Sequence, residues 1–228
     1  MERFKDLLKE SEYKFVKHNS HIYVTGAPIT GKSTISSLVS SSIADCTWQN
    51  MDIIRLTAQM VEEQKPENER NPFVYFGSCD AYTTVGDGVF SPESLIEGFI
   101  NYSEVVSSSL KFILPKLETQ GASDVLFDGV QLTPDIVKRH VNENSRLIVI
   151  TSTEERLISN ARKIFADEKW LLERYSPKKL LLLQDELLRQ AENFPKEKLL
   201  IVDNSGEILD SVIKIIHFLY TSNLIVAK

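Results

Sequence analysis

The sequence predicts an α/β protein in which helices cover a parallel β-sheet. Three short apolar runs, each followed by a helical pattern, occupy residues 125–127, 147–150 and 199–202. A fourth β-prone run, at residues 22–24, stops at a glycine and leads into a helical apolar pattern at 33–44. Strands that alternate with helices in this way belong to parallel sheets that are covered by helices. The length of 228 residues suits one such domain.

The composition is that of an ordinary folded protein. Hydrophobic residues make up 42% and charged residues 25% of the chain, so large-scale disorder is not expected. The formal net charge of −6 argues against a long nucleic acid as partner, because such partners require clustered Lys and Arg. Cys46 and Cys79 are too few for a disulfide framework and lack metal-ligand spacing. We therefore expect a reducing, cytoplasmic location.

The amino-terminal segment carries charges throughout and lacks the apolar stretch of a signal peptide. No apolar run approaches the roughly 20 residues of a membrane span, so no membrane partner is expected. Phe4, Leu7, Leu8 and Phe15 recur at near-helical spacing and predict an amphipathic helix within residues 1–19. The pattern does not define the role of this helix, and it leaves assembly into homo-oligomers open.

The core is predicted to span residues 20–152 and to include an acceptor-binding segment. A second strand and helix run from about residue 47 to 64 and end in the polar loop 65–68. The segment 71–90 fits neither pattern. Ser91 and Pro92 supply an N-cap and a first-turn proline, which predict one long helix that ends near Gln120.

The last third of the chain is predicted to contain a helical excursion. Residues 153–195 are charged, helical in pattern and too long for an ordinary crossover, so we expect a helical lid there. Residues 196–228 are expected to supply the last strand and a carboxy-terminal helix. The whole chain, 1–228, is therefore expected to form a single domain.

A phosphate-binding loop of the Walker A type lies between the first predicted strand and its helix. The pattern is a glycine, four further residues, then glycine, lysine and serine, and the loop with its next residue comprises Gly26, Ala27, Pro28, Ile29, Thr30, Gly31, Lys32, Ser33 and Thr34. Glycines let backbone N–H groups turn toward phosphate, and the helix adds its positive end. The alternative, an incidental glycine turn, does not explain this strand and helix context. We expect ATP, with Lys32 on its β- and γ-phosphates and Ser33 on Mg²⁺.

Asp128 ends the apolar run 125–127 and precedes Gly129. This position suits a carboxylate at the carboxyl end of a strand beside the phosphate loop, where it can bind Mg²⁺ or its water shell. The alternative is that Asp128 caps a turn or the helix that begins near Pro134.

Phosphoryl transfer develops negative charge that cationic side chains must stabilise. The helical excursion offers four cations, from which we predict Arg162 and Arg174 as catalytic: Arg156, Arg162, Lys163 and Arg174. Each has the alternative of a solvated or ion-paired surface role. Asp52 and Arg55 lie one helical turn apart and are suited to an acceptor's hydroxyl and anionic group. Their alternative is a surface ion pair.

Together these motifs resemble P-loop kinases of the nucleoside monophosphate kinase kind, and more particularly the prokaryotic 2-phosphoglycerate kinase family. The resemblance covers roughly residues 20–220 and is carried by segments 26–34, 52–55, 96–99 and 126–134. Asp128 and Gln131 depart from the glutamate and histidine usual in that family, and the Asp-Gly pair looks more like adenylate kinases. The usual acceptor-site pattern is replaced by Ser78-Cys-Asp80-Ala-Tyr82.

The resemblance implies a three-layer P-loop kinase fold with a five-stranded parallel sheet in the order 2-3-1-4-5 and a lid. It implies ATP- and Mg²⁺-dependent transfer of the γ-phosphate to a small phosphorylated or carboxylated metabolite resembling 2-phosphoglycerate. Lys32 and Asp52 are then catalytic together with the lid arginines, and Asp52 or Asp80 orients the acceptor hydroxyl. The predicted acceptor-binding residues are Asp52, Arg55, Asp80, Tyr82 and Gln131.

Two other functions share this loop. One is a regulatory ATPase or switch that acts on a protein partner. The other is a kinase acting on a nucleotide or a nucleic-acid end. A guanine-specific switch is disfavoured, because the chain contains no Asn-Lys-x-Asp sequence.

Overall fold

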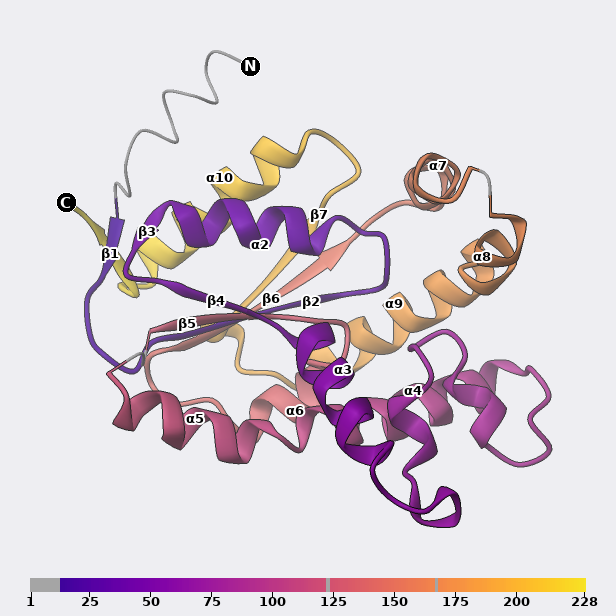
Figure 1. Cartoon of the computed structure of the whole chain (residues 1–228). Helices are drawn as coiled ribbons and strands as arrows, with labels where there is room; N and C mark the ends of the chain where they lie inside the picture. Colours follow the sequence, from indigo (N-terminus) through magenta and orange to yellow (C-terminus); the bar gives the residue numbers. More distant parts are fainter. Residues whose placement is uncertain (1–12, 122–123, 167) are drawn as a thin grey trace.

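A five-stranded parallel sheet forms the centre of the computed structural model, which describes residues 13–121, 124–166 and 168–228 (Figure 1). The strands lie in the spatial order β4-β5-β2-β6-β7, which is 2-3-1-4-5 when they are counted along the chain. This order confirms the prediction. The bounds are β2 (His21–Gly26), β4 (Thr47–Asn50), β5 (Val125–Asp128), β6 (Ser145–Thr151) and β7 (Leu199–Asp203).

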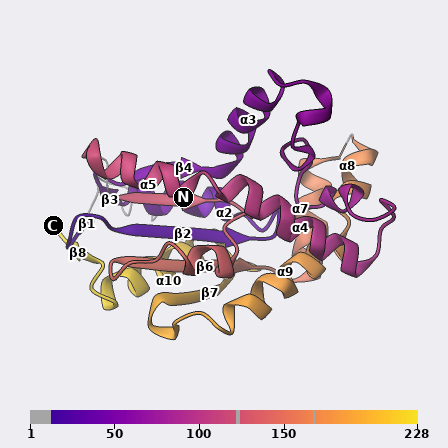
Figure 2. The ribbon, with the colours of Figure 1, turned by 90° about the horizontal axis from the view of Figure 1, so that it is seen from below.

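Helices cover both faces of the sheet, as predicted (Figures 1 and 2). Successive strand residues point to opposite faces, so Ile22 and Val24 pack on one side and Tyr23 on the other. The first side is covered by α2 (Lys32–Ser41) and α10 (Ile208–Thr221). The second is covered by α4 (Pro92–Ser107), α5 (Leu110–Thr119), α6 (Pro134–Lys138) and α9 (Pro177–Ala191).

Two excursions leave this three-layer core. The first follows β4 and consists of α3 (Met51–Glu62) and the 3₁₀ turns η1 (Glu67–Glu69), η2 (Pro72–Val74) and η3 (Ala81–Thr84). It accounts for much of the segment 71–90, which fits neither sequence pattern. The second follows β6 and consists of α7 (Glu154–Ile164) and α8 (Lys169–Arg174), after which α9 returns to the core and η4 (Lys196–Lys198) leads into β7.

The single long helix predicted over residues 91–120 is wrong, because the structure has two helices there. Ser91 caps α4 as expected, accepting a hydrogen bond from the Ser94 N–H at 3.0 Å. At the break, the hydroxyls of Ser108 and Ser109 donate to carbonyl oxygens three residues earlier. Such local bonds compete with the helical ladder, and Pro115 inside α5 removes a further donor from it.

The ends of the chain differ from the prediction. Residues 1–12 of the expected amino-terminal helix lie outside the described residues, and β1 (Tyr13–Phe15) is a strand where a helix was expected. It pairs with β3 (Ile43–Ala44) and with β8 (Ile225–Ala227), which follows the predicted carboxy-terminal helix α10. Alternating Tyr13 and Phe15 both pack on the α2/α10 side of the core, so burial at period two outweighs the helical spacing.

The helical stretch 154–194 is confirmed, but its parts differ in burial. Leu180, Leu183 and Leu187 of α9 are completely buried against the sheet, whereas α8 contains no buried residue. Of the three helices in this stretch, α8 therefore projects from the core, whereas α7 still packs on the core through the buried Leu157. Among the described residues, no helix combines the length and apolar character needed to cross a membrane.

A close contact between α4 and η3 provides a test of the fold. A Cβ at Gly98 would lie 2.5 Å from the Ala81 carbonyl carbon and even closer to the Tyr82 nitrogen. Because these are backbone atoms, Gly98→Ala should lower the free energy of unfolding by about 1–3 kcal/mol, as overpacking does. Urea denaturation measures the change. Gly206→Ala is the control, since nothing lies within 4 Å of its Cβ; equal stabilities of the two variants would contradict the contact.

Candidate active site

The phosphate loop connects the end of β2 to the start of α2. Gly26 lies so close to β6 that a Cβ would be 2.5 Å from the Ile150 carbonyl oxygen. Gly31 has a left-handed φ of +88°, and its Cβ would be 2.7 Å from Asn204 Nδ2. Both glycines are therefore required by the conformation. Gly31 caps α2 without a side-chain hydrogen bond, so the first N–H groups of the helix remain available for an anion.

Two asparagines that the sequence analysis missed hold this loop. Asn204 Nδ2 donates to the Thr30 carbonyl oxygen at 2.8 Å, and Asn160 Nδ2 donates to the Ile29 carbonyl oxygen at 3.0 Å. Ser211 in turn donates to Asn204 Oδ1 at 2.9 Å. The only sequence signal for Asn204 is its position just after β7, and the Asn160 contact has no local signal.

Asp128 lies beside the loop because β5 pairs with β2, with Val24 opposite Asp128. Ser33 Oγ donates to Asp128 Oδ1 at 3.4 Å. Asp128 is 1% exposed, and its Oδ2 makes no hydrogen bond among the described residues. Burial raises the pKa of this carboxyl, while the Lys32 charge and the Ser33 hydroxyl act in the opposite direction.

The pair Ser33 and Asp128 fits a magnesium ion. A buried carboxylate oxygen without a partner needs a cation or a donor, and oxygen ligands are those that Mg²⁺ prefers. Within the described ranges, no group of three His, Cys, Asp or Glu side chains could enclose a metal. Such an all-protein cage is not needed, because Mg²⁺ commonly takes one or two protein ligands together with phosphate and water.

A polar cavity of about 430 Å³ opens next to Lys32. Besides Pro28 of the loop, it brings together four predicted charged residues, which are the three cations Lys32, Arg55 and Arg174 and the acid Asp52. Its lining comes from the phosphate loop, α3, the segment after η2, α4, the loop after β5 and the end of α8: Pro28, Lys32, Asp52, Arg55, Gln59, Tyr75, Gly77, Ser78, Tyr102, Val130, Arg174 and Tyr175. The excess of positive charge favours an anionic ligand.

Asp52 and Arg55 both face this cavity from α3. Asn50 caps the helix by accepting a hydrogen bond from the Asp52 N–H at 2.7 Å. Arg55 Nη1 donates to the Val74 carbonyl oxygen at 3.1 Å and lies 3.5 Å from Gln59 Oε1. Arg55 is thus anchored to η2 and to its own helix, which differs from the alternative of a surface ion pair with Asp52.

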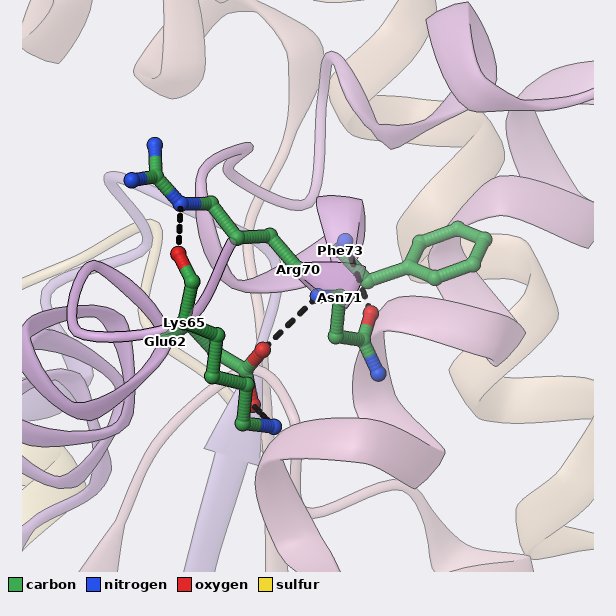
Figure 3. A network of polar contacts seen from close by, with 5 residues as sticks. All are labelled: Glu62, Lys65, Arg70, Asn71 and Phe73. Atoms are coloured by element: carbon green, nitrogen blue, oxygen red, sulfur yellow. Dashed lines mark hydrogen bonds and ion pairs between the residues drawn. The ribbon is translucent and has the colours of Figure 1, made fainter. Parts of the chain in front are cut away.

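A network after α3 folds the chain back so that η2 meets this helix (Figure 3). Glu62 accepts hydrogen bonds from Lys65 Nζ at 2.7 Å and from the Asn71 N–H at 2.8 Å. Arg70 Nε donates to the Lys65 carbonyl oxygen, and the Asn71 side chain accepts from the Phe73 N–H. The hydrogen bonds from Lys65 and Asn71 hold the pKa of Glu62 below its ordinary value. This turn places η2 where it supports the cavity.

Arg174 is held at the cavity by Asp80. Arg174 Nε forms an ion pair with Asp80 Oδ2, and Lys179 Nζ lies 3.7 Å from Asp80 Oδ1. Tyr82 packs edge-on against Phe90, with the Lys179 ammonium 4.8 Å from the Tyr82 ring centre. Neither Asp80 nor Tyr82 lines the cavity. The structure therefore places the predicted acceptor residue Asp80 behind Arg174 and the predicted acceptor residue Tyr82 beside Lys179.

The remaining predicted residues lie outside the cavity lining. Arg162 is exposed on α7. Arg156, one turn before the loop-binding Asn160, has a buried Nε that makes no hydrogen bond among the described residues. Gln131 is completely buried beneath Asp52 and Tyr102.

Known proteins resemble this chain in structure but not detectably in sequence. No family model matches the chain, and no curated protein matches it. A shikimate kinase from Bacteroides thetaiotaomicron aligns with a TM-score of 0.47 and 15% identity over 88% of this chain and 98% of that one. A thymidylate kinase from Candida albicans gives 0.47 and 14% over 92% and 96%. A gluconokinase from Sinorhizobium meliloti 1021 gives 0.45 and 12% over 90% and 94%. Similarities this distant concern the arrangement of the chain and do not identify an acceptor.

The role of Asn204 in holding the loop can be tested directly. Asn204→Ala removes the donor to the Thr30 carbonyl and leaves a buried oxygen unpaired, which costs about 1–3 kcal/mol. The affinity for ATP should fall by about tenfold or more, as measured by isothermal titration calorimetry. Asn68→Ala, on the exposed turn η1, is the control. Wild-type affinity in a folded Asn204→Ala protein would show that the loop does not need this bond.

Proposed function

We propose that this protein is an ATP-dependent kinase that phosphorylates a hydroxyl of a small phosphorylated or carboxylated metabolite. The observation that carries the proposal is the cavity beside Lys32, in which one carboxylate and two arginines face the phosphate loop. A loop alone would suit any nucleotide-binding protein. A charged cavity adjoining it supplies a place for a second, anionic reactant, and 2-phosphoglycerate is the first acceptor to test.

The residues around the loop would bind and orient the donor. ATP with Mg²⁺, when bound, supplies the transferable phosphoryl group and part of the charge neutralisation. The free N–H groups at the start of α2 and the Lys32 ammonium hold phosphate oxygens. Ser33 and Asp128 would hold the metal or its water shell, and the unpaired Asp128 Oδ2 is an oxygen available for that contact.

The residues of the cavity would bind and activate the acceptor. Arg55 binds its carboxylate or phosphate, and Asp52 accepts the hydroxyl proton as the new bond from oxygen to phosphorus forms and the bond to the leaving ADP breaks. Arg174 stabilises the negative charge on the transferring group. The loop side and the acceptor side meet at Lys32, which lines the cavity.

Transfer of labelled γ-phosphate tests this proposal. Wild-type protein with ATP and Mg²⁺ should label one member of a panel of 2-phosphoglycerate, 3-phosphoglycerate, glycerate, nucleoside monophosphates and short oligonucleotides. Lys32→Ala should abolish labelling with the fold intact, because the side chain serves phosphate. Labelling of a mononucleotide or an oligonucleotide instead would favour the nucleotide-kinase alternative. Slow ATP hydrolysis with no labelled acceptor would favour a regulatory ATPase.

The two predicted lid arginines should behave differently. Arg174 lines the cavity and is oriented by Asp80, whereas Arg162 is exposed on α7. Arg174→Ala should lower kcat by about a hundredfold, as loss of one preorganised donor does, while Arg162→Ala should change it less than threefold. Steady-state kinetics with the labelled acceptor compares them. A large effect of Arg162→Ala would require α7 to move over the loop during turnover.

A further inference from the structure

Gln131 lies in the loop after β5 with its side chain 0% exposed. Its Nε2 atom donates to Asp52 Oδ1 at 2.9 Å and to the Tyr102 hydroxyl oxygen at 2.6 Å. A primary amide nitrogen carries two hydrogens, so both are used in these contacts. The amide thus joins the carboxylate on α3 to the phenol on α4, below the cavity that both residues line.

The backbone around Gln131 is built to accept this side chain. A Cβ at position 129 would collide with Gln131 Oε1 and lie 2.6 Å from Met51 Cβ, so Gly129 is what allows the amide to reach under α3. Ser107 Oγ donates to the Gln131 backbone carbonyl at 3.0 Å and ties the loop to α4. Gly129 therefore leaves room for the amide, and α4 holds the loop that carries it.

This arrangement determines which way the Tyr102 hydroxyl hydrogen can point. The oxygen of Tyr102 already accepts a hydrogen from Gln131, and no described residue is seen to accept the phenol's own hydrogen. Burial, and secondarily the charge of Asp52, raises the pKa of Tyr102, so the phenol stays protonated. Because Tyr102 lines the cavity, its hydroxyl hydrogen can be donated to an oxygen of a ligand bound there.

We infer that Gln131 is a positioning residue, whose amide fixes the Asp52 carboxylate and directs the Tyr102 hydroxyl as a hydrogen-bond donor to the bound acceptor. This inference rests on the proposed kinase function and gives Gln131 a role different from the acceptor contact predicted from the sequence. It also narrows the chemical class of acceptor that the cavity would bind. The ligand presents a hydroxyl to Asp52 and a hydrogen-accepting oxygen to Tyr102, as a hydroxy acid or its phosphate ester does.

Two pairs of variants test the inference with 2-phosphoglycerate, or with whichever panel member is labelled. Gln131→Met keeps the length of the side chain but has no donor, and Gln120→Met is its control because Gln120 is exposed and does not line the cavity. Tyr102→Phe removes the hydroxyl, and Tyr23→Phe is its control because the Tyr23 hydroxyl is buried and makes no hydrogen bond among the described residues.

Gln131→Met should lower kcat by about tenfold or more, and Tyr102→Phe should raise the acceptor KM by a similar factor. Both controls should stay within about threefold of wild type, and the Kd for ATP should not change in any variant. The kcat/KM of the double variant Gln131→Met/Tyr102→Phe should fall by less than the product of the two single reductions in kcat/KM, because the two groups act together. Unchanged kinetics in both single variants, or effects that multiply fully, would overturn the inference.

Crystal structures of wild type and Gln131→Met give a readout that does not depend on turnover. Displaced Asp52 and Tyr102 side chains in the variant would support the positioning role. Side chains that stay in place would overturn it. If wild type labels no acceptor, the proposed function fails while this structural comparison still decides whether Gln131 positions its neighbours. If Gln131→Met does not fold, Tyr102→Phe against Tyr23→Phe carries the kinetic test.

Discussion

The central position of β2 in the parallel sheet is the constraint on which the candidate site depends. Because β5 and β6 flank β2, their carboxyl ends lie beside the phosphate loop, with Asp128 opposite Val24 and Ile150 opposite Gly26. The tight approach of Gly26 to the Ile150 carbonyl leaves no room for any side chain. Parallel open sheets generally bind ligands at this edge, where adjacent strands send their connections to opposite faces. The position of the phosphate loop, the proposed donor side of the site, therefore follows from strand order.

The cavity, which is the proposed acceptor side of the site, depends on polar contacts between irregular segments. Arg55 is anchored by the Val74 carbonyl, and Arg174 by Asp80. The network around Glu62 returns the chain to α3 so that these partners meet. Individually, exposed contacts of this kind stabilise a protein little. Their common effect here is to place cations around one cavity, so their loss should affect the proposed binding of an anionic acceptor more than folding.

Buried polar groups connect the two sides. Asn204 and Gln131 are both almost fully buried amides, and each satisfies groups from two different elements. An unpaired buried partner costs about 1–3 kcal/mol, so each amide strongly favours one arrangement of its neighbours. The first orders the phosphate loop. The second orders Asp52 and Tyr102, and thereby links the loop after β5 to the cavity.

The sequence by itself determined the alternation of strands and helices, the phosphate loop and the carboxylate at the end of β5, because each is encoded by local periodicity or by a fixed spacing along the chain. Tertiary structure alone decided that residues 13–15 form a strand, that Arg174 reaches the cavity while Arg162 does not, and that Asp80 lies behind Arg174. It also decided that Asn204 holds the loop and that Gln131 lies beneath Asp52. Several of these features arise from contacts between residues about 80 to 175 positions apart. Others arise because segments compete for burial in the core. A local sequence pattern contains neither the distant contacts nor the outcome of that competition.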